Sequence, residues 1–229
     1  MSNPLKTPAV SSRVVNTWDW PVRLCHWSFA ALVPAMWWTA ENSHWGWHLR
    51  LGHVLLAVLI FRIIWGFIGT RTARFSQFVK GPGAVIDYLR GRWDAKREIG
   101  HSPLGALAVL ALLSLMLAQV GMGLFAGDPF DGATGPLNDL VSISTADFLT
   151  DTHEWFYWLV FGMIGLHLCA IGFYGFIRMD DLISPMVSSG KMMPAEVEGN
   201  DKAPGLRAAG ALVVAIGVAV WVWFGAPGV

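Results

Sequence analysis

Five long apolar stretches, separated by more polar segments, run through this chain of 229 residues. The apolar stretches cover about residues 22–40, 51–69, 103–126, 154–177 and 206–224. A transmembrane α-helix needs about 20 predominantly apolar residues. The first stretch is short and the fifth is the most uniformly apolar, but each is long enough to span or nearly span a bilayer. The pattern predicts an all-α integral membrane protein, with a four-helix transmembrane bundle and a fifth, C-terminal transmembrane helix.

The composition fits a membrane protein better than a soluble domain. Hydrophobic residues make up 54% of the chain and charged residues 14%, whereas soluble domains carry about 25% charged residues. The first apolar stretch follows a polar segment and lacks a small-residue cleavage pattern, so we expect it to remain as a signal anchor. We expect contact with membrane lipid and none with nucleic acid.

Charged residues are divided unevenly between the loops. The loop between the second and third stretches is basic and contains Arg71, Arg74, Lys80, Arg90, Arg92, Lys96 and Arg97. The loop between the third and fourth stretches has no Lys or Arg and contains Asp128, Asp131, Asp139, Asp147 and Asp151. Lys and Arg near membrane ends stay on the cytoplasmic side. The N-terminus is therefore predicted to be cytoplasmic and the C-terminus extracytoplasmic.

Two polar segments are predicted to lie on the cytoplasmic side. Residues 82–93 separate apolar from charged side chains, which is typical of a short helix on the membrane surface, in contact with anionic lipid or with a partner. Residues 179–205 contain Gly, Pro and charged residues and are predicted to form a linker. The chain thus divides into a core at 1–178, a cytoplasmic linker at 179–205 and the fifth helix at 206–224.

Two histidines in the fourth stretch indicate sites for metal. His153 and His167 begin and end the segment HEWFYWLVFGMIGLH, fourteen residues apart. In a helix they lie within roughly 40° of one face and roughly 21 Å apart along the axis, so that one stands near each side of a bilayer. Imidazole in hydrocarbon is costly and tends to mark a functional site, and haem iron is a common reason for it.

Each haem needs two axial ligands, which a helix bundle supplies from facing helices. His26, in the segment RLCHW at the cytoplasmic start of the first stretch, shares a depth with His167, so these two can hold one haem. The partner of His153 is expected at the outer start of the second stretch. Three histidines stand there: His44, His48 and His53.

The spacing along the second stretch favours His48. Arg62 follows His48 by fourteen residues, which repeats the spacing of His153 and His167. His53 is rotated from His48 by roughly 140° and points to a different face. We therefore expect His48 and His153 to hold the outer haem, with His53 as the alternative ligand.

The remaining candidates are polar groups near the predicted haems. Arg62 is expected level with the inner haem, where it could pair with a propionate or a quinone oxygen, or else snorkel to the interface. His101, at the cytoplasmic start of the third stretch, is either a cap or turn residue or a contact to a propionate or quinone. His44 is predicted to be solvated. Cys25 and Cys169 belong to no CxxC or CxxCH motif, so any haem is non-covalent and b-type.

These residues lie in segments that resemble the bacterial cytochrome b561 family, which includes the cytochrome b subunits of nickel-iron hydrogenases. The resemblance covers about residues 15–192. It is carried by RLCHW, HLRLGHVLLAVLIFRIIWGFIGTRTARFSQFV, GHSPLGAL, HEWFYWLVFGMIGLH and, more weakly, SPMVSSGK. The resemblance implies a four-helix core that holds two haems b, with the ligands His26, His48, His153 and His167. Those four are the histidines that the spacing favours.

The resemblance also implies a function in the bacterial inner membrane. Electrons would pass between an extracytoplasmic dehydrogenase, hydrogenase or cytochrome c and the membrane quinone pool, and the acidic loop at 127–152 would suit a basic partner surface. Whether the chain is an enzyme by itself or a subunit of one stays open. One alternative is a superoxide:quinone oxidoreductase, although acidic outer loops would repel that anion. Another is a cofactor-free membrane anchor, in which the fifth helix docks a partner subunit.

Overall fold

The computed structural model describes residues 11–93, 99–128 and 133–228. It contains five long helices: α1 (Trp20–Glu41), α2 (Trp45–Ile68), α5 (Pro103–Phe125), α6 (Ile143–Phe176) and α8 (Gly205–Trp223). Within the described ranges, α2, α5, α6 and α8 are long and apolar enough to cross a membrane. The prediction of an all-α membrane protein is confirmed at this level. α1 has 22 residues but includes Arg23 and His26, and its crossing stays a prediction.

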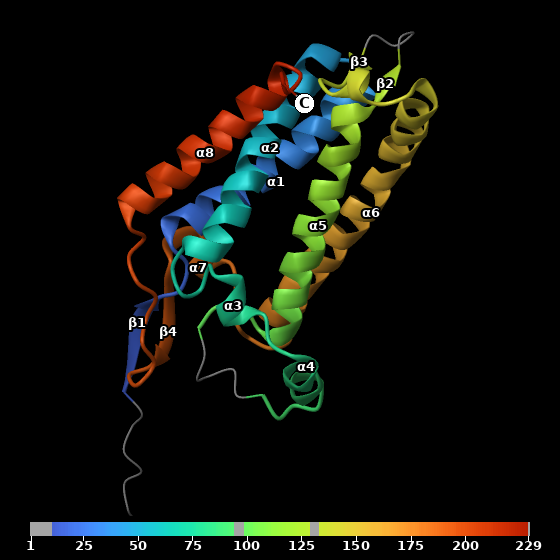
Figure 1. Ribbon diagram of the computed structural model, residues 1–229. Coiled ribbons are helices and arrows are strands. Elements are labelled where there is room, and N and C mark those ends of the chain that lie inside the picture. Colours follow the sequence, from blue (N-terminus) through green and yellow to red (C-terminus); the bar gives the residue numbers. More distant parts are fainter. Residues whose placement is uncertain (1–10, 94–98, 129–132, 229) are drawn as a thin grey trace, which may run out of the picture.

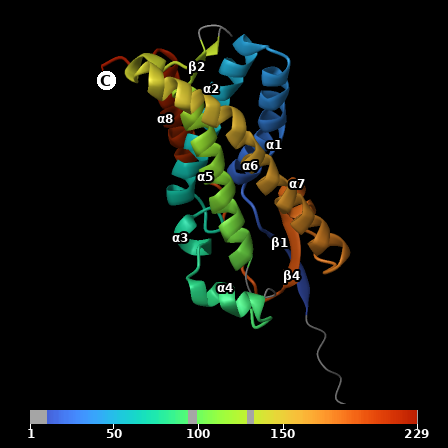
Figure 2. The same ribbon diagram turned by 90° about the vertical axis from the view of Figure 1, so that its right-hand side faces the viewer.

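The long helices form two groups, shown in Figure 1. α2 packs along α1 and along α8, whereas α5 packs along α6, and a smaller contact between α2 and α5 joins the groups. Figure 2 shows that α6 crosses α5 obliquely. In α6, all of which is described, the buried residues are Ala146 and Val160. Most of the core therefore comes from the other helices, and α6 lies at the edge of the molecule.

Short elements gather at the two ends of the long helices (Figure 1). One end has β1 (Ser12–Asn16), α3 (Phe75–Phe78), α4 (Pro82–Leu89), α7 (Ser184–Ser188) and β4 (Gly190–Pro194). The other end has β2 (Gly127–Asp128), β3 (Ala133–Thr134) and the 3-10 helix η1 (Asn138–Leu140). We call them the basic end and the acidic end, after the charges of their loops.

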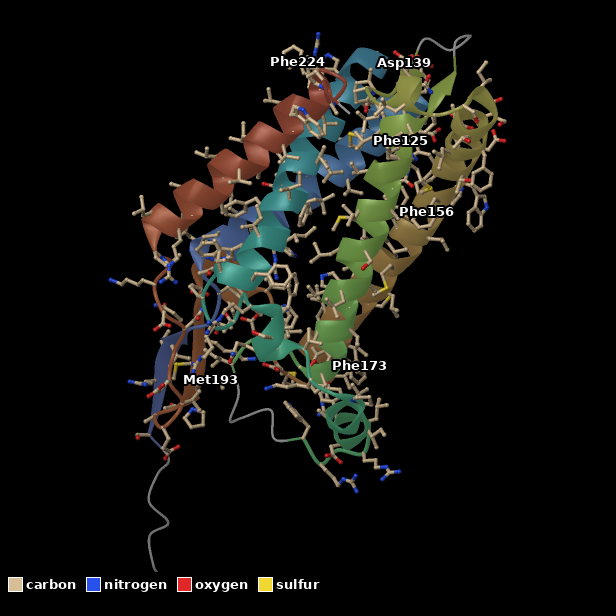
Figure 3. The ribbon with its side chains drawn as sticks, viewed as in Figure 1. Phe125, Asp139, Phe156, Phe173, Met193 and Phe224 are labelled. Atoms are coloured by element: carbon tan, nitrogen blue, oxygen red, sulfur yellow. The ribbon has the colours of Figure 1, made fainter. Side chains whose placement is uncertain are left out.

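Figure 3 places Met193 at the basic end and both Asp139 and Phe224 at the acidic end. Most of the charged loop residues from which the orientation was predicted lie in the described ranges. Lys96, Arg97 and Asp131 lie outside them. The orientation of the two ends relative to the cytoplasm stays a prediction.

Helix α6 begins earlier than the apolar pattern predicts, at Ile143 instead of about residue 154. Its first turns are polar and stand beyond the apolar stretch. The helix starts there because the side chain of Ser142 accepts a hydrogen bond from the backbone N–H of Thr145, which satisfies one of the free donors of the first turn. His153 consequently lies inside a continuous helix, three turns from its start.

Helix α8 packs against α2 through small side chains. Its buried residues recur every three or four positions: Ala208, Ala211, Ala215, Ala219 and Val222. Small residues at such a spacing let two membrane helices approach closely. One face of the fifth helix is therefore covered by this chain's own α2, while its other residues, such as Leu206 and Val213, are exposed.

The segment predicted as a linker contains regular structure. β4 pairs antiparallel with β1, with Ser12 opposite Pro194 and Asn16 opposite Gly190. After β4, the backbone N–H of Asn200 donates to the carbonyl of Asn16 at 2.7 Å. The segment is thus tied to the N-terminal residues before it enters α8. Hydropathy missed this sheet because two short, half-exposed strands far apart in sequence give no periodic signal.

A buried polar network lies beneath this sheet. The Asp19 carboxylate caps α1 by accepting from the backbone N–H of Val22 at 2.8 Å. It also accepts from Trp65 Nε1 at 2.8 Å and from Thr70 Oγ1 at 2.7 Å. The Asn200 side chain donates to Thr70 Oγ1 at 2.9 Å. The network therefore joins the start of α1, the end of α2 and the segment before α8.

We expect Asn200→Ala to destabilise the protein by about 2 kcal/mol, because it leaves buried hydroxyl groups without their partner. Besides Thr70, the Asn200 amide contacts Thr72 Oγ1 at 2.6 Å. For a chain of this size the unfolding midpoint should fall by about 4–8 °C, measured by a thermal scan in detergent. Asp201→Ala, at the exposed neighbouring position, is the control. Equal midpoints for the two variants would mean that the network does not stabilise the fold.

Candidate functional site

Two histidines from different helix groups face each other at the acidic end. His48, in the first turn of α2, and His153, in α6, have ring centres 6.2 Å apart and ring planes at 87°. Each is half-buried. The structure therefore brings together the two residues that the sequence paired at this end.

Backbone carbonyls hold both rings through the same nitrogen. His48 Nδ1 lies 3.0 Å from the carbonyl oxygen of Met36 in α1. His153 Nδ1 lies 2.9 Å from the carbonyl oxygen of Gln119 in α5. A carbonyl only accepts, so Nδ1 carries the proton in both rings and Nε2 keeps a lone pair. This arrangement is usual for a histidine that binds metal through Nε2. In His153 this Nε2 also lies 3.5 Å from the side-chain Nε2 of Gln119.

A cavity of about 530 Å³ adjoins both histidines. It lies among α1, α2, α5, α6 and the loop of β2 and β3, and its lining is mainly apolar. The size falls within the range of about 300–1,000 Å³ that is usual for cofactor sites. Two carboxylate residues, Glu41 and Glu154, also line it. The acidic end thus has an apolar chamber with three imidazoles in its wall, those of His48, His53 and His153.

The backbone of α5 leaves room for the His153 ring at Gly123. A Cβ atom at this position would stand 2.8 Å from His153 Cε1 and 3.2 Å from its Nδ1. Such distances are shorter than van der Waals contact. Together with the Gln119 carbonyl, Gly123 forms a cradle that fixes the imidazole.

A second pair stands at the basic end. His26 in α1 and His167 in α6 have ring centres 6.4 Å apart and ring planes at 59°. Both are half-buried. His26 Nδ1 is buried and has no hydrogen-bond partner within the described residues. This pair, like the first, is the one that the sequence predicted.

The distances in both pairs fit one iron between two imidazoles. The midpoints lie 3.1 and 3.2 Å from the ring centres, as halves of 6.2 and 6.4 Å. A metal–nitrogen bond of about 2.0–2.1 Å plus roughly 1.1 Å within the ring gives about 3.2 Å. The described ranges hold no group of three or more His, Cys, Asp or Glu suited to a metal. Two ligands suit haem, since the porphyrin supplies the others.

His53 and His44 occupy different surroundings. His53 Nδ1 lies 2.7 Å from the carbonyl oxygen of Leu49, one turn earlier in α2. Its ring packs against Trp223 of α8 at 4.6 Å between ring centres, so it contacts the fifth helix although it also lines the cavity. His44 is exposed at the start of α2. This geometry favours His48 as the partner of His153.

Arg62 is buried in α2, with 5% of its surface exposed. Its guanidinium lies 5.3 Å from the centre of the Phe75 ring and makes a long contact of 3.5 Å with the Ala73 carbonyl. The buried Asp19 carboxylate is close enough to interact with its charge, but no carboxylate of the described ranges forms an ion pair with it. A buried cation without a paired anion is costly, which favours the prediction of an anionic or carbonyl partner from a ligand.

His101 precedes α5, which is capped by the neighbouring Ser102. The His101 ring lies between Trp18 and Phe78, at 4.5 and 4.4 Å between ring centres, and its Nδ1 has no described partner. Burial, with the nearby Arg62 charge, lowers the pKa of His101 to about 3. His101 is therefore neutral at physiological pH, and its contact to a propionate or quinone stays a prediction.

The sequence did not reveal Gln119 and Gly123 as parts of the site. The Gln119 side chain donates to the His153 carbonyl at 3.0 Å, and the Gln119 backbone carbonyl accepts from the His153 ring. A polar residue one turn before a glycine in an apolar helix was the available signal. It did not indicate which histidine the two residues would meet.

The comparison with protein families gave one match. A family model described as prokaryotic cytochrome b561 matches residues 17–189. No curated protein and no solved structure matches. The matched range includes the four paired histidines and ends before α8.

Proposed function

Because the chain belongs to the prokaryotic cytochrome b561 family, it is a membrane b-type cytochrome of electron transfer, and we propose that it holds two haems b in series. His48 and His153 would hold one haem, and His26 and His167 would hold the other. Electrons pass between an extracytoplasmic redox partner and the membrane quinone. The two histidine pairs, fourteen residues apart along α6 and with nearly equal ring separations, carry this proposal.

The chain contributes ligands and their orientation. When bound, haem b supplies an iron that takes up and releases one electron. The carbonyls of Met36 and Gln119 keep the Nδ1 protons of His48 and His153 in place, which leaves Nε2 for the metal. With two histidines as its ligands, the iron would have no position free for oxygen, and each site would suit electron transfer.

The acidic end suits a basic partner. Asp147, Asp151 and Glu154 are exposed and follow one another by four and three residues, so they lie on one face of the first turns of α6. Glu41 and Glu154 line the cavity of the histidine pair. A cytochrome c or a dehydrogenase subunit with a basic surface would be attracted to this face. The same carboxylates would repel superoxide, which disfavours that alternative.

Arg62, which packs on Phe75 of α3, and His101, which packs on Phe78 of α3, lie at the basic end, as does the second pair. The Arg62 charge is close enough to influence both Cys25, beside His26, and His101. We propose that the Arg62 guanidinium pairs with a haem propionate or a quinone oxygen. His101, being neutral, is a hydrogen-bond partner for the same groups.

Electron transfer across a bilayer tests the proposed function. The haem-loaded protein is reconstituted into proteoliposomes that contain trapped ferricyanide. When dithionite is added outside, we expect the trapped ferricyanide to be reduced and to lose its colour. Vesicles with the His48→Ala, His153→Ala double variant should bleach only at the leak rate of empty vesicles. Haems that become reduced while the trapped ferricyanide stays oxidised would contradict a path across the membrane.

A further inference from the structure

We propose that a groove at the basic end binds the ring of a membrane quinone. We call it the α1–α7 groove; it is lined by Trp20, Arg23, Leu24, Trp27, Met186 and Val187. The inference rests on the proposed function, and it names the place where electrons leave or enter the quinone. It also gives a role to Arg23 and Trp27 of the RLCHW segment, in which so far only His26 has one.

One wall of the groove is a single face of α1. Trp20, Arg23, Leu24 and Trp27 stand at intervals of three, one and three residues, which places them together on a helix. Trp20, Leu24 and Trp27 are 48%, 58% and 47% exposed. The groove has a volume of about 640 Å³. An open apolar groove of this size is suited to a flat ring that arrives from the lipid.

The other wall is α7, and side chains of α1 fix it in place. Arg23 donates through Nη1 to the carbonyl of Val187. Trp27 donates through Nε1 to the carbonyl of Met186 at 3.1 Å. α7 leads directly into β4, which pairs with β1 just before α1. The two walls are therefore held at a set distance by hydrogen bonds and by the sheet.

The groove contacts the second histidine pair through one aromatic side chain. The Trp27 ring stands edge-on to His26, with 5.1 Å between ring centres and 90° between planes. His26 in turn faces His167. A ligand in contact with Trp27 is thus separated from a haem ligand by a single indole. A redox-active ligand at this short distance can exchange electrons with the haem site, whereas an ordinary lipid tail cannot.

The polar group of the groove suits a quinone carbonyl. A guanidinium has five N–H donors, and Arg23 uses one in its described contact, through Nη1. No carboxylate of the described ranges forms an ion pair with Arg23. The remaining donors can hold a neutral carbonyl oxygen and also the oxygen charge that develops as the quinone is reduced. The tryptophans and Leu24 cover the ring.

The electrons and protons for quinone reduction have identified sources. Reduction of one quinone to the quinol takes two electrons and two protons. The electrons come singly from the extracytoplasmic partner by way of the His26–His167 site. The protons come from water at the basic end, where the groove is open. When the reaction runs in the opposite direction, oxidation of the quinol releases two electrons to the His26–His167 site and two protons to water.

Filling the groove tests the proposal. We expect Leu24→Trp and Val187→Trp, at two exposed positions on opposite walls, to weaken binding of decylubiquinone to the oxidised protein in nanodiscs by about tenfold or more. Reoxidation of the dithionite-reduced protein by decylubiquinone should slow to a similar degree, with the haem content unchanged. Leu206→Trp, at a position of α8 that is 89% exposed and outside the groove, is the matched control and should behave as wild type.

The other outcomes distinguish a failure of the proposed quinone site from a failure of the proposed function. Wild-type binding and reoxidation in both groove variants would overturn the quinone site. Loss of a co-purified phospholipid from these variants, with quinone binding kept, would assign the groove to lipid and also overturn it. A wild-type protein with two haems that neither binds nor is oxidised by decylubiquinone would instead refute the quinone part of the proposed function.

Discussion

Replacing His48 with Ala is expected to lower the haem content from two per chain to one, whereas His53→Ala is expected to leave two. The structure gives the reason, because the His48 ring stands 6.2 Å from His153 and is oriented by the Met36 carbonyl. Alanine would remove one of the two proposed ligands of this haem, and a lone imidazole would hold haem b weakly. Haem is counted as the pyridine haemochrome per polypeptide in detergent-purified protein.

His48→Ala and His53→Ala each serve as the experimental control for the other, because the two histidines are five residues apart on one helix. Elution as a single symmetric peak in gel filtration would show that both variants are folded. His53→Ala removes a ring that packs on Trp223 of α8, so it should lower stability without altering the spectrum. If His53→Ala loses a haem and His48→Ala keeps two, the ligand is His53, and the pairing at the acidic end is wrong.

Gly123→Ala is expected to remove most of the same haem, although it adds a single methyl group far from the iron ligands in sequence. The new Cβ would stand 2.8 Å from His153 Cε1. The ring cannot retreat without breaking the hydrogen bond between its Nδ1 and the Gln119 carbonyl. The haem content should approach one per chain, and the remaining haem should keep the spectrum and potential of the His26–His167 site.

Gly121→Ala is the matched control for this substitution. Gly121 lies two residues earlier on α5, and nothing stands within 4 Å of a Cβ built there. Both variants change the helix propensity of glycine by the same amount, so a difference between them isolates the contact with His153. Two haems in Gly123→Ala would show that the ring moves freely and that α5 does not position it.

The sequence predicted the long helices and the histidine pairs because both follow from periodicity. Fourteen residues in an α-helix return nearly to the same face, so the spacing of His153 and His167 determines their separation whatever surrounds them. The apolar stretches gave helix positions to within a few residues for α5 and α8. α8 follows the core at the predicted position and is one of the four helices within the described ranges that are apolar enough to cross, whereas a fifth span stays a prediction.

Other features depend on contacts that no local pattern contains. The strands β1 and β4 are more than 170 residues apart in sequence, and Asn200 reaches Thr70 and Thr72 from beyond β4. Trp18 precedes α1 and lies outside the five apolar stretches. It is 7% exposed and packs on His101, because the segment before α1 folds back over the loop after α2.

The early start of α6 has a different cause. Hydropathy detects the part of a helix that suits lipid, and the capped polar turns from Ile143 onward do not contribute to it. The predicted acidic loop therefore includes three helical turns. This helix presents Asp147, Asp151 and Glu154 on one face, which a flexible loop would not do.

The most direct test of the account is the haem content of the purified wild-type chain, with a dithionite-reduced minus oxidised spectrum of the same sample. Two haems b per polypeptide, both low-spin, are predicted by two pairs of histidines with matched ring separations. A single haem would contradict the two paired sites that stand fourteen residues apart along α6. A protein without haem would refute the electron-transfer function altogether.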